Sequence, residues 1–230
     1  MATQIHWFPG HMKKALNEIE ERIKVVDVII ELLDSRAPLS SINEQLQKIA
    51  QNKKKLVVLT KPDLADPTQT ELWKNKLVGQ FDMLLVLDLT KNSAQNEIAK
   101  AVSKLGEEKH ARDIRRGMKP QPIRAMILGI PNVGKSSLIN RLAGRRAAGV
   151  QNKPGFTRGE QWIKINKDFL LLDTPGVLPM SYEDTKKAAN LALLGAIRED
   201  ILPNHDLVDF LINFLKANYP TALKDRFGIE

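Results

Sequence analysis

A short segment in the middle of the chain has the residue types and spacing needed to bind a chain of phosphates. Residues Gly129–Ser136 read Gly-Ile-Pro-Asn-Val-Gly-Lys-Ser and match the pattern G-x-x-x-x-G-K-[ST]. Glycines allow such a loop to wrap closely around phosphates, with the backbone N–H groups of Asn132, Val133 and Gly134 directed inward. The ammonium of Lys135 is expected to bridge the β- and γ-phosphates and to act in catalysis.

Hydroxyl and carboxylate groups that suit a Mg²⁺ ion accompany this loop. Ser136 is expected to bind Mg²⁺, while Ser137 can reach the α-phosphate. The segment Asp173–Gly176 (Asp-Thr-Pro-Gly) ends an apolar, strand-like run, so its carboxylate is expected to hold Mg²⁺ through water and the N–H of its glycine to contact the γ-phosphate. Thr157 is the candidate for a second hydroxyl ligand of the metal.

A possible reader of the nucleotide base precedes this loop in the chain. Residues Thr60–Asp63 read Thr-Lys-Pro-Asp, and the Asp63 carboxylate can accept two hydrogen bonds from guanine that adenine does not offer. The stem of Lys61 would cover the base. Thr60 stands where asparagine is usual, and we expect its substitution to lose an amide that contacts the base and ties it to the phosphate loop. A P-loop NTPase without strict guanine preference is therefore an alternative.

Alternating strand and helix patterns must position these motifs. They predict an α/β fold with a mostly parallel sheet and helices on both faces, in which the hairpin Ile163–Leu171 is the antiparallel exception. The expected strands are Val25–Leu33, Leu56–Thr60, Met83–Leu87, Arg124–Gly129, Gln161–Ile165 and Phe169–Asp173. The expected helices are Met12–Lys24, Ile42–Gln51, Thr70–Gly79, Asn96–Leu105, Lys135–Gly144, Tyr182–Arg198 and Leu207–Ala217.

The order of the motifs and the composition set the domain organisation. In most GTPases the base reader comes last, so the chain is predicted to be a circularly permuted P-loop GTPase domain over residues 1–178, with a short helical C-terminal extension over 179–230. Gly106–Pro122 is charged and ends in prolines, which predicts a surface linker. At 230 residues and 43% hydrophobic, the chain can bury one sizeable core. With no cysteine, secretory leader or long apolar run, we expect a cytoplasmic protein without a membrane partner.

Basic residues exceed acidic ones, and their clustering favours a polyanionic partner. The formal net charge is +8 and the pI is about 9.6. A single basic run is usually a solvated face, but several runs in one small domain favour nucleic acid, especially beside the nucleotide loops. The three clusters are Lys48, Lys53, Lys54, Lys55 and Lys61; Arg141, Arg145, Arg146, Lys153 and Arg158; and Lys109, Arg112, Arg115, Arg116, Lys119 and Arg124.

Several motifs together resemble one known family. The segments His6–Met12, Asp34–Pro38 and Gly129–Ser137, with the permuted motif order, are similar to the ribosome biogenesis GTPase A family (the YlqF type). The resemblance implies binding of GTP and GDP with Mg²⁺, and slow hydrolysis that the ribosomal particle stimulates. It also implies a precursor of the large (50S) ribosomal subunit and its rRNA as partners. Family members carry a longer helical C-terminal domain, so the extension is expected to be shorter here.

The same resemblance assigns roles to further residues. Ras-like enzymes place a water-orienting glutamine where Val177 stands, and the family gives that role to the histidine that matches His11. Asp88 and Leu89 fall in the family's base-contacting loop, although its serines are missing here. Asn132 occupies a position linked in related GTPases to K⁺, which makes K⁺ a candidate activator. Because of Val177, a nucleotide-switched rRNA-binding factor with little hydrolysis is the main alternative.

Overall fold

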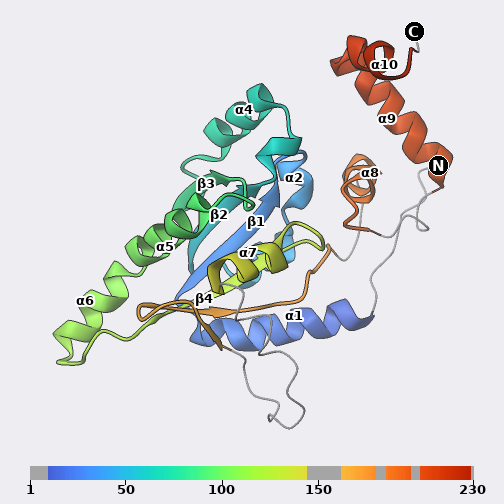
Figure 1. The fold of residues 1–230 in the computed structure, drawn as a ribbon. Coiled ribbons are helices and arrows are strands. Elements are labelled where there is room, and N and C mark those ends of the chain that lie inside the picture. The colour runs from blue at the N-terminus through green and yellow to red at the C-terminus, as the bar shows by residue number, and fades with distance from the viewer. Residues whose placement is uncertain (1–9, 144–161, 180–184, 198–202, 229–230) are drawn as a thin grey trace. The chain divides into compact units, whose positions relative to one another are not determined.

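A six-stranded sheet forms the centre of the computed structural model, which describes residues 10–143, 162–179, 185–197 and 203–228. The strand order is β3-β2-β1-β4-β6-β5, and every neighbouring pair is parallel except β5 with β6, in which Trp162 pairs with Leu172 (Figure 1). The predicted mostly parallel α/β sheet with its antiparallel hairpin is therefore confirmed. The strands are β1 (Val28–Asp34), β2 (Lys54–Thr60), β3 (Met83–Leu87), β4 (Ile123–Gly129), β5 (Trp162–Lys164) and β6 (Phe169–Leu172).

Helices cover the sheet on both faces. Side chains of α1 and α3 share one apolar cluster with Ile29, Met126 and Leu128 from the strands, while α5 and α7 also contact the sheet. The helices of this part are α1 (Gly10–Arg22), α2 (Pro38–Ser41), α3 (Glu44–Ile49), α4 (Pro67–Leu77), α5 (Ser93–Leu105), α6 (Glu107–Arg115) and α7 (Lys135–Ala143), with short 3₁₀ turns η1 (Ile23–Val25) and η2 (Pro62–Leu64).

The central strand β1 is buried along its whole length and carries one charged residue in its middle. Glu31 is 3% exposed, and its carboxyl accepts a 2.5 Å hydrogen bond from the Gln47 amide. Burial raises the pKa of Glu31 to about 7. Ile29 and Leu33, two positions to either side on the same face of the strand, belong to separate apolar clusters. Glu31 thus lies between these clusters.

The prediction of a surface linker over Gly106–Pro122 is wrong, because most of this segment is the helix α6. Glu107 and Glu108 lie in its first turn and Arg112 in its last turn, which complements the helix dipole. An ion pair four residues apart, Lys109 with Asp113 at 3.6 Å, adds to the stability of the helix. The helix forms although its sequence lacks the apolar stripe that would have predicted it.

A second compact unit holds the described residues from Thr185 to Gly228, while the first extends from Gly10 to Pro179. Its helices are α8 (Thr185–Leu193), α9 (Asn204–Asn218) and α10 (Pro220–Phe227). The sequence did not predict α10, whose first residue is a proline; proline suits the first position of a helix because no partner is needed there for its missing N–H. Among the helices described, none is long and apolar enough to cross a membrane.

Candidate nucleotide-binding site

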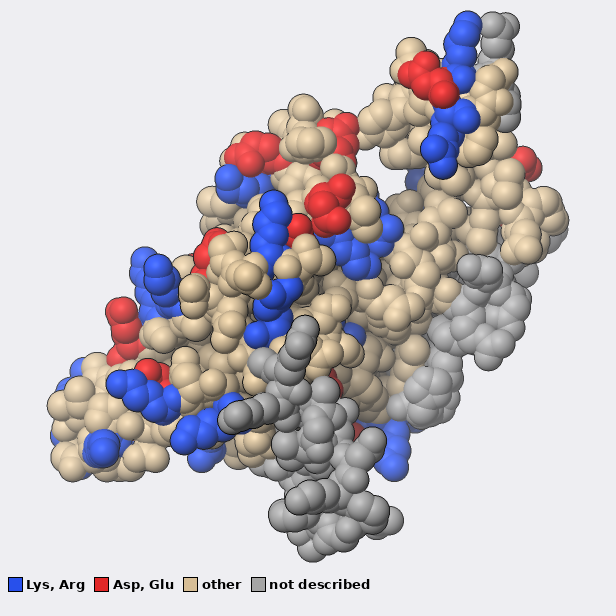
Figure 2. Space-filling view, viewed as in Figure 1, with Lys and Arg blue, Asp and Glu red and all other residues tan. Residues whose placement is uncertain are grey.

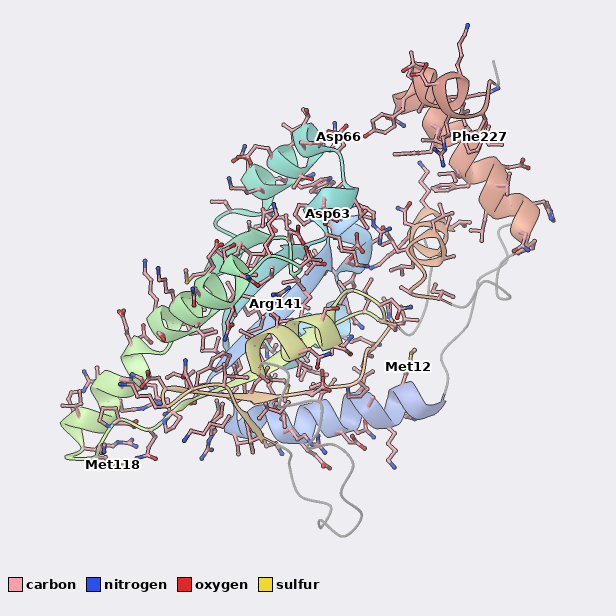
Figure 3. The ribbon with its side chains drawn as sticks, in the orientation of Figure 1. Met12, Asp63, Asp66, Met118, Arg141 and Phe227 are labelled. Atoms are coloured by element: carbon pink, nitrogen blue, oxygen red, sulfur yellow. The ribbon has the colours of Figure 1, made fainter. Side chains whose placement is uncertain are left out.

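The carboxyl ends of the parallel strands surround a cavity of about 790 Å³, with Asp63 and Arg141 labelled beside it in Figure 3. Parallel α/β sheets bind ligands at this edge because the loops that follow the strands converge there. The lining residues come from the loops after β2, β3 and β4 and from α5 and α7: Lys61, Asp63, Leu64, Asp88, Leu89, Thr90, Gln95, Val133, Gly134, Ser137, Asn140 and Arg141. The fold thus brings together the predicted base reader and phosphate loop, although about 65 residues separate them in the chain.

The phosphate loop has the backbone shape that its glycines allow. Gly134 has a φ of 113° and Asn132 a φ of 58°, both in the left-handed half of the map. Gly129 has a φ of 154°, and a Cβ there would lie 2.9 Å from the Leu32 carbonyl oxygen. Side chains at either glycine would therefore strain the loop or displace a neighbouring strand.

Lys135 is held over this loop in a largely buried position. Its ammonium donates to the carbonyl oxygens of Gly129 at 3.1 Å and Ile130 at 2.8 Å. Only 8% of the residue is exposed, and burial lowers the pKa of Lys135 to about 8. A buried cation at the start of a helix is suited to neutralise phosphate charge.

The Asp-Thr-Pro-Gly segment lies directly against the phosphate loop. A Cβ at Gly176 would stand 2.8 Å from the backbone nitrogen of Pro131 and 2.9 Å from the Lys135 ammonium. The Thr174 hydroxyl donates to the Ile127 carbonyl of β4 and fixes the segment on the sheet. Burial raises the pKa of Asp173, and the nearby charge of Lys135 partly offsets this.

The oxygen groups at this position fit a Mg²⁺ ion. Ser136 is exposed in the first turn of α7, and the Asp173 carboxylate is half-buried beside the loop. Both are hard oxygen ligands, and Mg²⁺ commonly uses one or two of these together with substrate phosphates and water. In the described part of the chain no three His, Cys, Asp or Glu side chains form a metal cluster, which such a site does not require. Thr157 lies outside the described residues.

Thr60 keeps a link to the phosphate loop, so the expectation that its substitution loses this tie is wrong. Its hydroxyl lies 2.8 Å from the Val133 carbonyl oxygen and 3.2 Å from that of Leu33, and can donate to either. The residue is completely buried, so its side chain cannot reach a base in the cavity. Threonine in place of asparagine therefore preserves the link to the phosphate loop but not the contact with the base.

Lys61 connects the base reader to two other motifs. Its ammonium lies 2.7 Å from the Asn132 carbonyl oxygen of the phosphate loop and 3.0 Å from the Asp34 carboxylate. Asp34 is 1% exposed and also accepts two hydrogen bonds from the Arg36 guanidinium, at 2.9 and 2.8 Å. Burial raises the pKa of Asp34, but the hydrogen bonds from Arg36 and Lys61 outweigh this effect and hold that pKa below its usual value.

Asp34 and Arg36 were not predicted from sequence as members of this site. Asp34 ends β1, the strand between those that carry the base reader and the phosphate loop. The sequence did contain a signal for them: Asp34 is an acidic residue at the carboxyl end of a central strand, two positions before an arginine.

Arg141 fixes the loop after β3, which contains the predicted residues Asp88 and Leu89. Its guanidinium donates to the carbonyl oxygens of Leu89 at 3.2 Å and of Thr90, and to the Asn92 side chain at 2.6 Å. The Asp88 carboxylate accepts from the Thr90 N–H and hydroxyl, at 2.9 and 2.6 Å. Arg141 was grouped by sequence with cations suited to nucleic acid, but its guanidinium is committed to this loop.

Val177 faces the core and not the cavity. It is fully buried in a cluster with Ala15, Leu16 and Ile19 of α1, and its N–H donates to the Gly129 carbonyl at 3.3 Å. Helix α1 therefore packs behind the Asp-Thr-Pro-Gly segment. His11 lies in the first turn of α1, but its side chain is outside the described part of the structure.

Relatives of known identity match nearly the whole chain. Ribosome biogenesis GTPase A of Bacillus pumilus is 42% identical over 225 residues, which cover 98% of this chain and 80% of the relative. The chain belongs to the ribosome biogenesis GTPase A family. The resemblance seen in the motifs is thereby confirmed, as is the prediction of a GTPase.

Other matches agree with membership of this family. A family model described as 50S ribosome-binding GTPase matches residues 124–225. Mitochondrial ribosome-associated GTPase 1 of Xenopus tropicalis is 32% identical over 241 residues, which cover 98% of this chain and 74% of the relative. The crystal structure of GNP-bound YlqF from T. maritima has a TM-score of 0.66 at 23% identity, covering 94% of this chain and 77% of that one, and supports the fold.

Proposed function

We propose that this protein binds GTP with Mg²⁺ and hydrolyses it to GDP and phosphate as an assembly factor of the large ribosomal subunit in the cytoplasm. The observation that carries the proposal is the convergence of the base reader, the phosphate loop and the β3–α5 loop on one cavity. The family and its ribosome-related relatives support the choice of partner.

The base is proposed to lie between Lys61 and the loop after β3. Asp63 is exposed at the cavity, where its carboxylate can accept from the guanine N1–H and amino group. Asp88 and Leu89 line the opposite side, held by Arg141. The hydrogen bonds of Lys61 and Thr60 to the phosphate loop would fix the distance between base and phosphates.

The phosphates are proposed to lie on the loop from Asn132 to Ser137. Lys135 would leave its loop carbonyls for the β- and γ-phosphates, and Gly176 would bring its N–H to the γ-phosphate. Ser136 and, through water, Asp173 would hold the Mg²⁺ ion, with Thr157 as a further ligand. When bound, this ion neutralises charge that develops on the phosphate oxygens.

The attacking water needs a partner other than residue 177, because Val177 is apolar and fully buried. We propose His11 for this role, since a histidine can orient water near neutral pH and α1 packs behind the segment that ends in Gly176. Asn132 at the loop makes K⁺ a candidate activator. Replacing K⁺ with Na⁺ in the assay of GTP turnover tests this.

GTP turnover with and without purified large ribosomal subunits tests this function. We expect slow turnover by the free protein and at least a tenfold increase with the particle. His11→Ala should lower the stimulated rate about tenfold or more while GTP affinity stays near that of the wild type. GTP binding without turnover, in either condition, would instead establish the nucleotide-switched binding factor with little hydrolysis.

A further inference from the structure

The end of α6 and the turn after it form a basic tip whose cations lie within 4.0 Å of no acidic side chain in the described part of the chain. We define the α6 tip as Arg112, Arg115, Arg116 and Lys119, all exposed. Two exposed apolar side chains, Ile114 (62% exposed) and Met118 (48%), lie among them. Figure 2 shows Lys and Arg side chains over this end of the domain.

The acidic residues of α6 form their ion pairs with cations outside the tip. Asp113 is buried and is engaged by Lys109 at 3.6 Å and by the Gln121 N–H at 3.1 Å. Glu108 lies 3.6 Å from Lys54, in the first turn of the helix. Arg115 and Arg116 lie three and four residues after Arg112, so each is its neighbour at the end of the helix and the like charges repel. An external anion would relieve that repulsion.

The tip is also held rigidly against the domain. The Lys109 ammonium donates to the carbonyl oxygens of Gln121 at 2.8 Å and Pro122 at 3.1 Å, and lies 3.9 Å from Asp27. Gly117 turns the chain with a φ of 70°, and the Met118 N–H donates to the Asp113 carbonyl at 2.9 Å. The backbone that carries these cations is therefore already ordered before binding, so that only the side chains lose conformational freedom.

From this arrangement we infer that the α6 tip is a docking surface for the phosphate backbone of double-helical RNA, and that it acts independently of the bound nucleotide. Arginine forks suit phosphate oxygens, whereas the core of a protein–protein interface is usually depleted of charge. The inference rests on the proposed function for the source of the RNA, the large ribosomal subunit.

Independence from the nucleotide follows from the position of the tip. The strand β4 begins beside the tip at Ile123 and ends in the phosphate loop at Gly129, a rise of about 20 Å. Met118 lies far from Asp63 and Arg141 in Figure 3. None of the tip residues lines the nucleotide cavity. The tip would thus hold RNA in both nucleotide states.

The test compares two variants of equal charge, each with four exposed cations changed to glutamine. One carries Arg112→Gln, Arg115→Gln, Arg116→Gln and Lys119→Gln; the control carries Lys14→Gln, Lys76→Gln, Lys100→Gln and Lys216→Gln. The probe is a fluorescent RNA duplex of about 20 base pairs, long enough for the span of known duplex-binding domains. It is titrated at several salt concentrations with GDP or a non-hydrolysable GTP analogue.

We expect the tip variant to bind RNA at least tenfold more weakly in both nucleotide states. The slope of log affinity against log salt should become shallower by roughly two to four, since each phosphate contact contributes about 0.9 in duplex DNA. The control should bind within about threefold of wild type, and unchanged affinity for labelled GTP in both variants would show intact folding.

Equal losses in the two variants, wild-type binding by the tip variant, or no duplex binding by the wild type would each overturn the inference. Displacement of the RNA by polyglutamate as effectively as by unlabelled duplex would point to an acidic protein partner and overturn it too. Failure of large subunits to stimulate wild-type GTP turnover would instead remove the proposed function, while the duplex comparison still decides on the tip.

Discussion

The cations beside the nucleotide cavity and those of the α6 tip differ in what their side chains contact. At the carboxyl edge, Lys61, Lys135 and Arg141 each donate to backbone carbonyl oxygens. At the amino edge, the four cations of the α6 tip project into solvent with no acidic side chain of the described residues within 4.0 Å. Cations that donate hydrogen bonds to the protein's own backbone therefore shape a specific pocket, whereas solvent-exposed cations attract a polyanion through their charge.

These two arrangements should respond to different variables. Nucleotide affinity at the carboxyl edge is expected to depend on a few buried contacts and on the protonation of Lys135, whereas RNA affinity at the α6 tip is expected to depend on counterion release. Variants at one edge are therefore expected to leave binding at the other unchanged, and the following predictions use that separation.

The largest effect is expected from Lys135→Ala. Removing the buried ammonium takes away the main positive charge near the β- and γ-phosphates, so GTP affinity should fall at least about 100-fold and turnover should disappear. Labelled-nucleotide titration measures this, with Lys100→Ala on the exposed face of α5 as the matched control. RNA affinity should stay within about twofold. If the Lys135→Ala variant bound GTP normally, the loop that carries Lys135 would not be the phosphate-binding element.

A strong pH dependence of GTP affinity is expected above pH 8. The pKa of Lys135 is about 8 because the group is buried, and bound phosphates would raise it. Below pH 8 the ammonium is charged with and without nucleotide, so affinity should be flat. Above pH 8 binding must take up a proton, and affinity should fall by up to about tenfold per pH unit.

Titration from pH 6.5 to 9.5 at constant ionic strength measures this dependence. The Lys135→Ala variant supplies the control, because its residual affinity should lack the break near pH 8. A flat profile in the wild type would show that the ammonium does not lose its proton in this range.

Asp34→Asn should produce a smaller effect confined to the base side. The change removes the buried charge that holds Arg36 and Lys61, so we expect GTP to bind about tenfold more weakly. KM should rise while kcat at saturation stays nearly constant, since Asp34 contacts no phosphate-binding group. Steady-state kinetics with large subunits measures the split.

Two companion variants make this result interpretable. Arg36→Lys retains the charge beside Asp34 and should lose less affinity than Asp34→Asn, while the exposed change Asp209→Asn on α9 should have no effect. A fall in kcat equal to the rise in KM would assign Asp34 to the chemical step or to general stability.

The strands could be predicted closely from sequence because each is a short apolar run bounded by polar residues. Met83–Leu87 was predicted with the bounds that the structure has. The motifs at the strand ends identified the edge that carries the cavity, since their chemistry is local. Parallel pairing then brings Thr60 and Val133 together although 73 positions separate them.

Features that depend on ion pairs and distant contacts could not be predicted in this way. Helix α6 contains few apolar residues, and Lys109 anchors it to groups that are remote in sequence. The hydrogen bond from Arg141 to the Leu89 carbonyl oxygen spans 52 positions and follows no motif. Thr60 was expected to lose the link to the phosphate loop because it lacks the amide of asparagine. Its hydroxyl nevertheless reaches the Val133 carbonyl oxygen of that loop.

The most direct test of the guanine-nucleotide site is a competition measurement on the wild type and Asp63→Asn. Labelled GTP bound to the wild type should be displaced by unlabelled GTP at concentrations at least about 100-fold lower than by ATP. In Asp63→Asn the preference should move to xanthosine triphosphate, because the amide can donate to the 2-oxo group that replaces the amino group of guanine. Equal displacement of labelled GTP by ATP and GTP in the wild type would contradict the account and favour an unselective P-loop NTPase.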